Sequence, residues 1–134
     1  MLRIAGQIFC VDLVVFDKDG TLLSFDALWQ TWFEEMFKAL SAQITLNEAI
    51  QQGMANNLGY DRESGAWDPF GPLTLASTGD VSVLMAGQLY QHGHVHWDSA
   101  LTIVAQARQQ ARQAVLARNV IHPIGDVRRA LSGL

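Results

Sequence analysis

The segment VDLVVFDKDGTLL, residues 11–23, determines the fold expected for this chain. Its first part, residues 11–16, is short, largely apolar and rich in β-branched side chains, as in a strand buried on both faces. Asp17 and Asp19 follow two positions apart. At the end of an extended strand this spacing directs both carboxylates to one side and Lys18 to the other. The segment therefore predicts a buried strand that ends in paired acids, which is where open α/β sheets bind their ligands.

Paired carboxylates at such a place suit the chemistry of phosphate esters. One carboxylate can attack phosphorus and form an acyl-phosphate. Its neighbour can keep a proton, because two like charges this close do not both ionise easily, and it can then act as a general acid or base. A dianionic phosphate beside two acids also requires a cation, and Mg²⁺ is the usual oxygen-seeking choice. Gly20 marks the turn after the acids, because glycine reaches backbone angles that other residues avoid.

The run FDKDGTL, which contains both acids, resembles the first motif of the haloacid dehalogenase-like (HAD) hydrolases, a hydrophobic strand followed by D-x-D-G-T-L. The resemblance implies that Asp17 is the nucleophile and Asp19 the general acid/base. It implies Mg²⁺ as cofactor, held by the Asp17 carboxylate and the Asp19 backbone carbonyl. It also implies that the loop backbone at Lys18, Gly20 and Thr21 binds the phosphate. The second Asp of the motif favours phosphatase over dehalogenase chemistry.

The same resemblance implies an α/β protein with a Rossmann-like HAD core, of which this chain is the mostly α part. We expect one core strand with the catalytic loop in residues 1–24, a four-helix cap in 25–120, and a return segment into the core in 121–134. The cap would close over the site and exclude water. The two crossings between core and cap, near Ser24–Phe25 and near Asn119–Pro123, are the expected hinges.

Helical periodicity supports the expected cap. The first helix follows Asp26, a candidate N-cap, and carries one apolar stripe at helical spacing: Trp29, Trp32, Phe33, Met36, Phe37 and Leu40. A capping box of Thr45 and Glu48 predicts the start of the second helix, and Gly59 is its expected stop signal. The third and fourth helices are expected at about 80–90 and 98–118, the latter ending at Asn119 and carrying a stripe of small residues that permits close packing.

Residues 59–79 are rich in Gly and Pro yet contain several aromatic residues, which predicts an ordered loop packed on the helices. Loops this long in a compact domain are often functional. The run LGYD, residues 58–61, also resembles, more weakly than the FDKDGTL run does, a loop of bacterial phosphoglycolate-phosphatase-like HAD proteins.

The later motifs of the family have no counterpart in the sequence. The family needs a Ser/Thr after the next strand, then a Lys or Arg and a second acidic pair; after Lys38 there is no further lysine. Lys18 cannot fill the lysine role, because we expect it to point away from the acids. We therefore expect an N-terminal fragment of a Mg²⁺-dependent phosphomonoester hydrolase that is nearly inactive alone. Its substrate would be a small phosphorylated metabolite of a kind that the sequence does not specify.

Other interpretations of these residues are weaker. An EF-hand loop with Gly20 at its sixth position would place Val15 at the first ligand position, where a valine side chain cannot bind calcium. An ordinary Asp-Gly turn explains the four residues D-x-D-G, but it does not explain the apolar strand before them or the Thr-Leu pair after them. The alternate histidines His92, His94 and His96 suggest either a metal site, a polar turn between helices, or one histidine that faces the substrate phosphate.

Composition limits the remaining function classes. The net charge of −4 disfavours nucleic-acid binding, although five arginines and a single acid follow Asp98; we expect most of these arginines on solvated helix faces. The single cysteine, Cys10, excludes an internal disulfide and suits a reducing cytoplasm. No apolar run approaches the ~20 residues that cross a bilayer. The alternative to an enzyme is a helical protein-interaction module with a vestigial loop, and an oligomer formed through an apolar core edge is left open.

Overall fold

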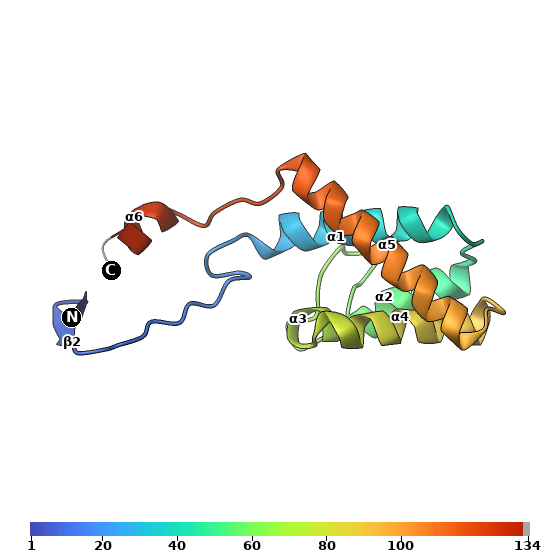
Figure 1. Cartoon of the computed structure of the whole chain (residues 1–134), viewed down its shortest axis with the longest axis horizontal. Coiled ribbons are helices and arrows are strands. Elements are labelled where there is room, and N and C mark those ends of the chain that lie inside the picture. Colours follow the sequence, from blue (N-terminus) through green and yellow to red (C-terminus); the bar gives the residue numbers. More distant parts are fainter. Residues whose placement is uncertain (133–134) are drawn as a thin grey trace.

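The structure, a computed structural model, describes residues 1–132 of the chain. It is mostly helical, with one small sheet at the N-terminus (Figure 1). The strands are β1 (Leu2–Ile4) and β2 (Gln7–Phe9), and the helices are α1 (Phe25–Ser41), α2 (Glu48–Leu58), α3 (Pro72–Leu75), α4 (Thr78–His92), α5 (Trp97–Arg118) and α6 (Val127–Ser132). Among these residues, no helix is long and apolar enough to cross a membrane.

Helices α1 to α5 form one bundle with a continuous apolar core. The most extensive contact is between α1 and α5, while α4 packs against both α5 and α2. The expected stripe on α1 is confirmed, with Trp32, Phe33, Met36 and Leu40 buried. The small-residue stripe of α5 is also buried, at Ala100, Val104, Ala107, Ala111 and Val115. Small side chains on α5 allow the aromatic face of α1 to approach closely, which explains the crossing of the two helices in Figure 1.

The helix ends differ from the sequence expectation in several places. The cap of α2 is Asn47, whose side chain accepts the Ile50 amide, so the predicted Thr45–Glu48 box is wrong. A capping box forms instead at α4, between Ser77 and Asp80. The predicted cap Asp26 lies in the first turn of α1, where a negative charge still favours the helix dipole. Short polar side chains are common near helix starts, so residue type alone does not fix the capping position.

The predicted stops of α2 and α5 are confirmed. Gly59 ends α2 with φ +78° and Asn119 ends α5 with φ +51°, both in the left-handed region. Gly59 has a second constraint, because its backbone passes close to Gly71. A Cβ built on Gly59 would lie 3.1 Å from the Gly71 Cα and 3.1 Å from the Asp68 Cβ. This close approach holds the two ends of the loop, residues 59 and 71, next to each other.

We expect Gly59→Ala to lower the free energy of unfolding by about 1–3 kcal/mol, since it adds left-handed strain and a crowded contact. Gly87→Ala is the matched control. It lies inside α4 with nothing within 4 Å of the added Cβ, so it should raise stability by about 0.5–1 kcal/mol. Urea denaturation of both variants measures the difference; equal effects of the same sign would contradict the tight approach at Gly59.

The N-terminal part does not form the predicted buried strand. Residues 1–10 form an antiparallel hairpin in which Leu2 pairs with Phe9. Its turn residues Ala5 and Gly6 both have positive φ, as tight hairpins require. Residues 11–16 are extended but belong to no strand, and Leu13 and Val15 are 77% and 82% exposed. A strand needs a neighbour for its amides, and the described residues place none beside this segment.

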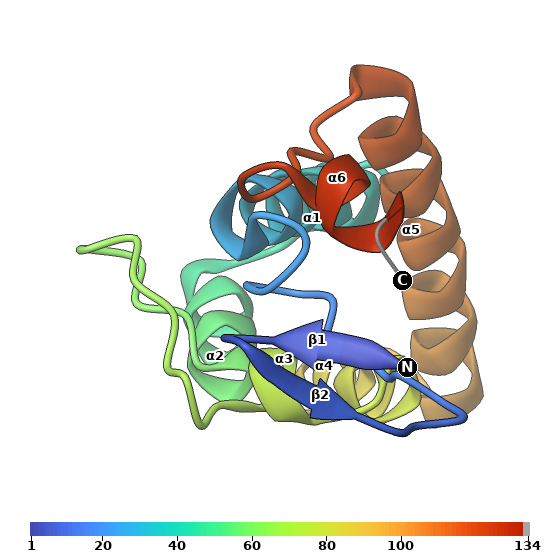
Figure 2. The same ribbon diagram turned by 90° about the vertical axis from the view of Figure 1, so that its left-hand side faces the viewer.

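The two crossings into and out of the helical bundle lie side by side. The Ser24 amide donates to the His122 carbonyl at 2.8 Å, and the Ile124 amide donates to the Leu22 carbonyl at 2.9 Å. These bonds join residues 22–24 to 122–124, which we call the neck. Beyond it, the hairpin and α6 lie at the same end of the molecule, away from the bundle (Figures 1 and 2).

The neck falls where the sequence placed the hinges, and α6 falls within the predicted return segment. Residues 133–134 of that segment lie outside the described residues. The predicted single core strand is absent from the described chain, so the architecture is a helical bundle with a two-stranded hairpin. The mostly helical character is confirmed, while the α/β core stays a prediction.

Candidate functional site

The acidic motif forms a compact turn immediately before the neck. The Lys18 carbonyl accepts the amides of Leu22 and Leu23 at 3.0 and 2.9 Å, and the Gly20 amide donates to the Leu23 carbonyl at 2.8 Å. Gly20 has φ +80°, so the positive-φ turn expected at this glycine is present. The closed turn fixes the backbone between the two acids and the first turn of α1.

The two carboxylates have different partners in this turn. The Thr21 hydroxyl donates to Asp17 Oδ2 at 2.6 Å. The Lys18 ammonium group donates to Asp19 Oδ1. The expectation that Lys18 points away from the acids is therefore wrong. The alternation of a strand does not apply to an unpaired segment, and the flexible lysine stem reaches the neighbouring acid. Asp17 is exposed, whereas Asp19 is partly buried.

The donor set fits a magnesium ion in part. Mg²⁺ commonly binds one or two carboxylates and completes its octahedron with water and phosphate oxygens. Asp17 and Asp19 provide two carboxylates. No group of three or more His, Cys, Asp or Glu within residues 1–132 is arranged to hold a metal ion. A magnesium site at this turn would therefore need further oxygens from water, from a substrate, or from groups beyond the described part of the chain.

Asp19 also borders the long loop between α2 and α4. A hollow of about 490 Å³ is lined by Asp19 and Gly20, by Phe25 at the start of α1, and by loop residues that include Trp67. Trp67 packs edge-on against Phe25 and Phe33, with ring centroids 6.3 and 5.5 Å away. The expectation of an ordered loop packed on the helices is confirmed, and this loop lies beside the acidic turn.

The Asp61 side chain, in the LGYD run, makes its hydrogen bonds within its own loop. It accepts the Ser64 hydroxyl at 2.7 Å and the Glu63 amide at 2.9 Å. The Ser64 hydroxyl, followed by the amides of Glu63 and Ser64, holds the pKa of Asp61 below its usual value. These bonds shape the turn over 61–65, so the geometry gives Asp61 a structural role.

A larger cavity of about 720 Å³ is lined in part by Lys18 of the acidic turn. Its walls are formed by helices α1 and α5, by the first residue of α4, and by Ile121, which directly precedes the neck. Three cationic residues line it, together with polar, aromatic and aliphatic side chains: Lys18, Arg108 and Arg112; Thr78 and Gln109; Leu28, Trp29, Trp32, Ala105, Val115, Leu116 and Ile121.

Sequence reasoning missed the role of the arginines on α5. Arg108 is partly buried, and its Nη1 donates to the Thr78 carbonyl at 3.1 Å and to the Ser82 hydroxyl at 3.0 Å. Arg112 lies one helical turn further along the same side of α5. Four of the five arginines after Asp98 are exposed, as expected for most of them, and Arg108 is the exception. The sequence signal was the position of Arg108 beside the apolar stripe, next to the buried Ala107.

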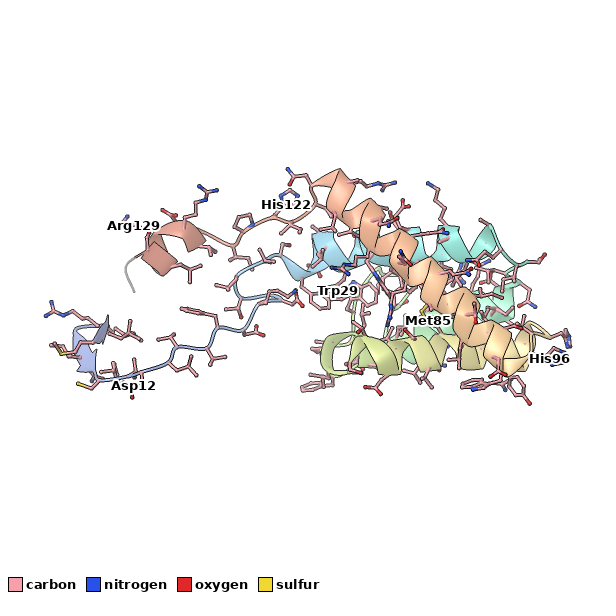
Figure 3. The ribbon with its side chains drawn as sticks, in the orientation of Figure 1. Asp12, Trp29, Met85, His96, His122 and Arg129 are labelled. Atoms are coloured by element: carbon pink, nitrogen blue, oxygen red, sulfur yellow. The ribbon has the colours of Figure 1, made fainter. Side chains whose placement is uncertain are left out.

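The three histidines lie far from the acidic turn. His92 ends α4, His94 has a left-handed backbone, and His96 precedes α5. Figure 3 shows His96 at the end of the bundle opposite to Trp29 and the neck. The suggestion that one of them faces a phosphate at Asp17 is therefore wrong. The segment forms the turn between two helices, as one of the alternatives predicted.

Comparison of the chain with models of known protein families, with curated proteins and with solved structures found no significant match. Statements about its function therefore depend on the motif and on the geometry described above.

Proposed function

We propose that this chain provides the catalytic loop and helical cap of a Mg²⁺-dependent phosphomonoester hydrolase that acts through an aspartyl-phosphate on Asp17. The observation that carries the proposal is the closed acidic turn at the base of the bundle. It joins an exposed carboxylate, Asp17, to a second acid, Asp19, at the point where the chain enters α1. The proposed substrate is a small phosphorylated metabolite.

Four side chains of the acidic motif have a role in the proposed reaction. The exposed carboxylate of Asp17 attacks phosphorus, and the Thr21 hydroxyl orients it through Oδ2. Asp19 protonates the leaving oxygen and later accepts a proton from the attacking water. The Lys18 ammonium beside Asp19 adds positive charge where the phosphate would lie. A bound magnesium ion would neutralise the charge of the phosphate beside the two acids.

The exposed segment 11–16 supports the proposal that other strands complete this site. All of its side chains except Asp12 are apolar, yet Leu13 and Val15 are more than three-quarters exposed. Apolar side chains in an extended segment gain stability when neighbouring strands cover them. Such strands would also bring the Ser/Thr, the lysine and the second acidic pair that the resemblance requires.

We expect the 134-residue chain alone to hydrolyse p-nitrophenyl phosphate at close to the uncatalysed rate. The natural polypeptide, expressed from its complete gene, should show turnover that requires Mg²⁺ and stops when EDTA removes the metal. Release of p-nitrophenol measures both, with added MgCl₂ after EDTA as the recovery control. Full activity in the presence of EDTA would contradict the assignment of a magnesium phosphatase.

A helical protein-interaction module is the second candidate function. Its support is the same exposed apolar segment 11–16, which a protein partner could cover without any chemistry at Asp17. Absence of turnover in the natural polypeptide, on several phosphate esters with Mg²⁺, would favour this candidate over the phosphatase.

A further inference from the structure

We propose that the 720 Å³ cavity between α1, α5 and the acidic turn binds a small organic anion that has an aromatic or apolar body. Its size lies within the range of small-molecule sites, about 300–1,000 Å³. The inference depends on the proposed function in one respect: it takes this anion to be the substrate whose phosphate Asp17 attacks. Binding itself requires neither the metal nor the reaction.

The charged lining selects an anion. Lys18, Arg108 and Arg112 contribute positive charge, and no acid lines the cavity among the described residues, although the chain as a whole has a net charge of −4. Arg108 is held in place by the carbonyl of Thr78 and the hydroxyl of Ser82 on α4, so its guanidinium group is oriented before a ligand arrives. Fixed guanidinium groups bind carboxylates and phosphates with directional, charge-assisted hydrogen bonds.

The apolar lining selects a ligand with a hydrophobic body. Trp29 and Trp32 meet edge to face, with ring centroids 5.6 Å apart, and Leu28, Val115 and Ile121 also line the cavity. The Trp29 indole nitrogen is buried and has no acceptor among the described residues. This nitrogen has almost no surface exposed to the cavity, so the donors open to a ligand are those of Lys18, Arg108 and Arg112. A bare inorganic ion would leave the indole and aliphatic surfaces without a partner.

Phenylphosphonate is a suitable probe, because it combines a phosphate-like anion with an aromatic ring and is not hydrolysed. Isothermal titration calorimetry of the chain at about 0.15 M salt, without Mg²⁺, compares it with inorganic phosphate and with benzyl alcohol. We expect phenylphosphonate to bind about 10-fold or more tightly than either, because only it uses both the cationic and the aromatic lining.

Two substitutions at exposed lining positions test the charge. Arg112→Gln removes a cation and should raise the Kd for phenylphosphonate about 10-fold. Gln109→Glu introduces a negative charge into the lining at almost unchanged size and should raise the Kd similarly. Gln110→Glu is the matched control, since Gln110 is the exposed neighbour on α5 and does not line the cavity; its Kd should change less than about 2-fold. Circular dichroism verifies that all variants remain helical.

The outcomes separate this inference from the phosphatase assignment. Asp17→Asn removes a negative charge from beside the expected phosphate, so phenylphosphonate should bind the chain at least as tightly as before, while the same substitution removes activity from the natural polypeptide. Binding that weakens in Arg112→Gln and Gln109→Glu supports the cavity even if no ester is ever hydrolysed. Inorganic phosphate that binds as tightly as phenylphosphonate, a Kd unaffected by both lining substitutions, or no binding of the probe would each overturn the inference.

Discussion

Asp17→Asn is expected to lower kcat for p-nitrophenyl phosphate by about 10⁴-fold or more in the natural polypeptide, the scale seen when a catalytic nucleophile is removed. An amide is a poor nucleophile towards phosphorus, so the covalent step would fail. The substituted side chain can still accept the Thr21 hydroxyl through its amide carbonyl oxygen, so the turn should persist.

Asp12→Asn is the control for this experiment. Asp12 is exposed, as Asp17 is, and belongs to the same N-terminal segment, but it lies well away from the bundle (Figure 3). Its substitution removes the same charge and should leave kcat within about 2-fold, because a distant exposed charge is screened by salt. Near-normal turnover in Asp17→Asn would exclude Asp17 as the nucleophile, whatever the cap binds.

Met36→Ala should cause the largest loss of stability, about 2–5 kcal/mol in the free energy of unfolding. Met36 is on α1 and has no solvent exposure. Truncation removes three heavy atoms from the bundle core and leaves a cavity that close-packed helices refill only in part. Urea denaturation followed by circular dichroism at 222 nm measures the change.

Leu116→Ala is the matched stability control, because it also removes three heavy atoms from a helix. Leu116 is 59% exposed on α5, so its loss should cost less than about 1 kcal/mol. Similar midpoints for the two variants would show that the bundle is not packed around Met36 as described.

The helices could be predicted because their signals are local. Apolar residues at helical spacing identified the buried face of α1, and Gly59 and Asn119 marked where α2 and α5 end. Helix starts were less accurate, since Thr45 and Asn47 are both plausible caps and only the folded chain distinguishes them. The sequence signal for the acidic turn was also local, and Gly20 adopts the positive φ that this signal predicted.

The features that sequence reasoning missed depend on distant neighbours. A strand at 11–16 requires another strand beside it, and the apolar pattern of the segment says nothing of whether that neighbour is present. Arg108 contacts Thr78 and Ser82, which lie 30 and 26 positions earlier in the chain, so these two hydrogen bonds could not be inferred from local spacing. The side chain of Lys18 turned towards Asp19 because an unpaired segment does not keep the alternation of a sheet.

The neck has a consequence for protein engineering. Because residues 22–24 and 122–124 are hydrogen-bonded neighbours, the bundle begins and ends at almost one point. Such a unit can be grafted into a surface loop of an unrelated host without stretching the host's backbone. The bundle could thus carry its cavity into another protein as a transplantable module. A short linker across the neck would join its two ends, and new ends opened in another loop would give a circularly permuted form.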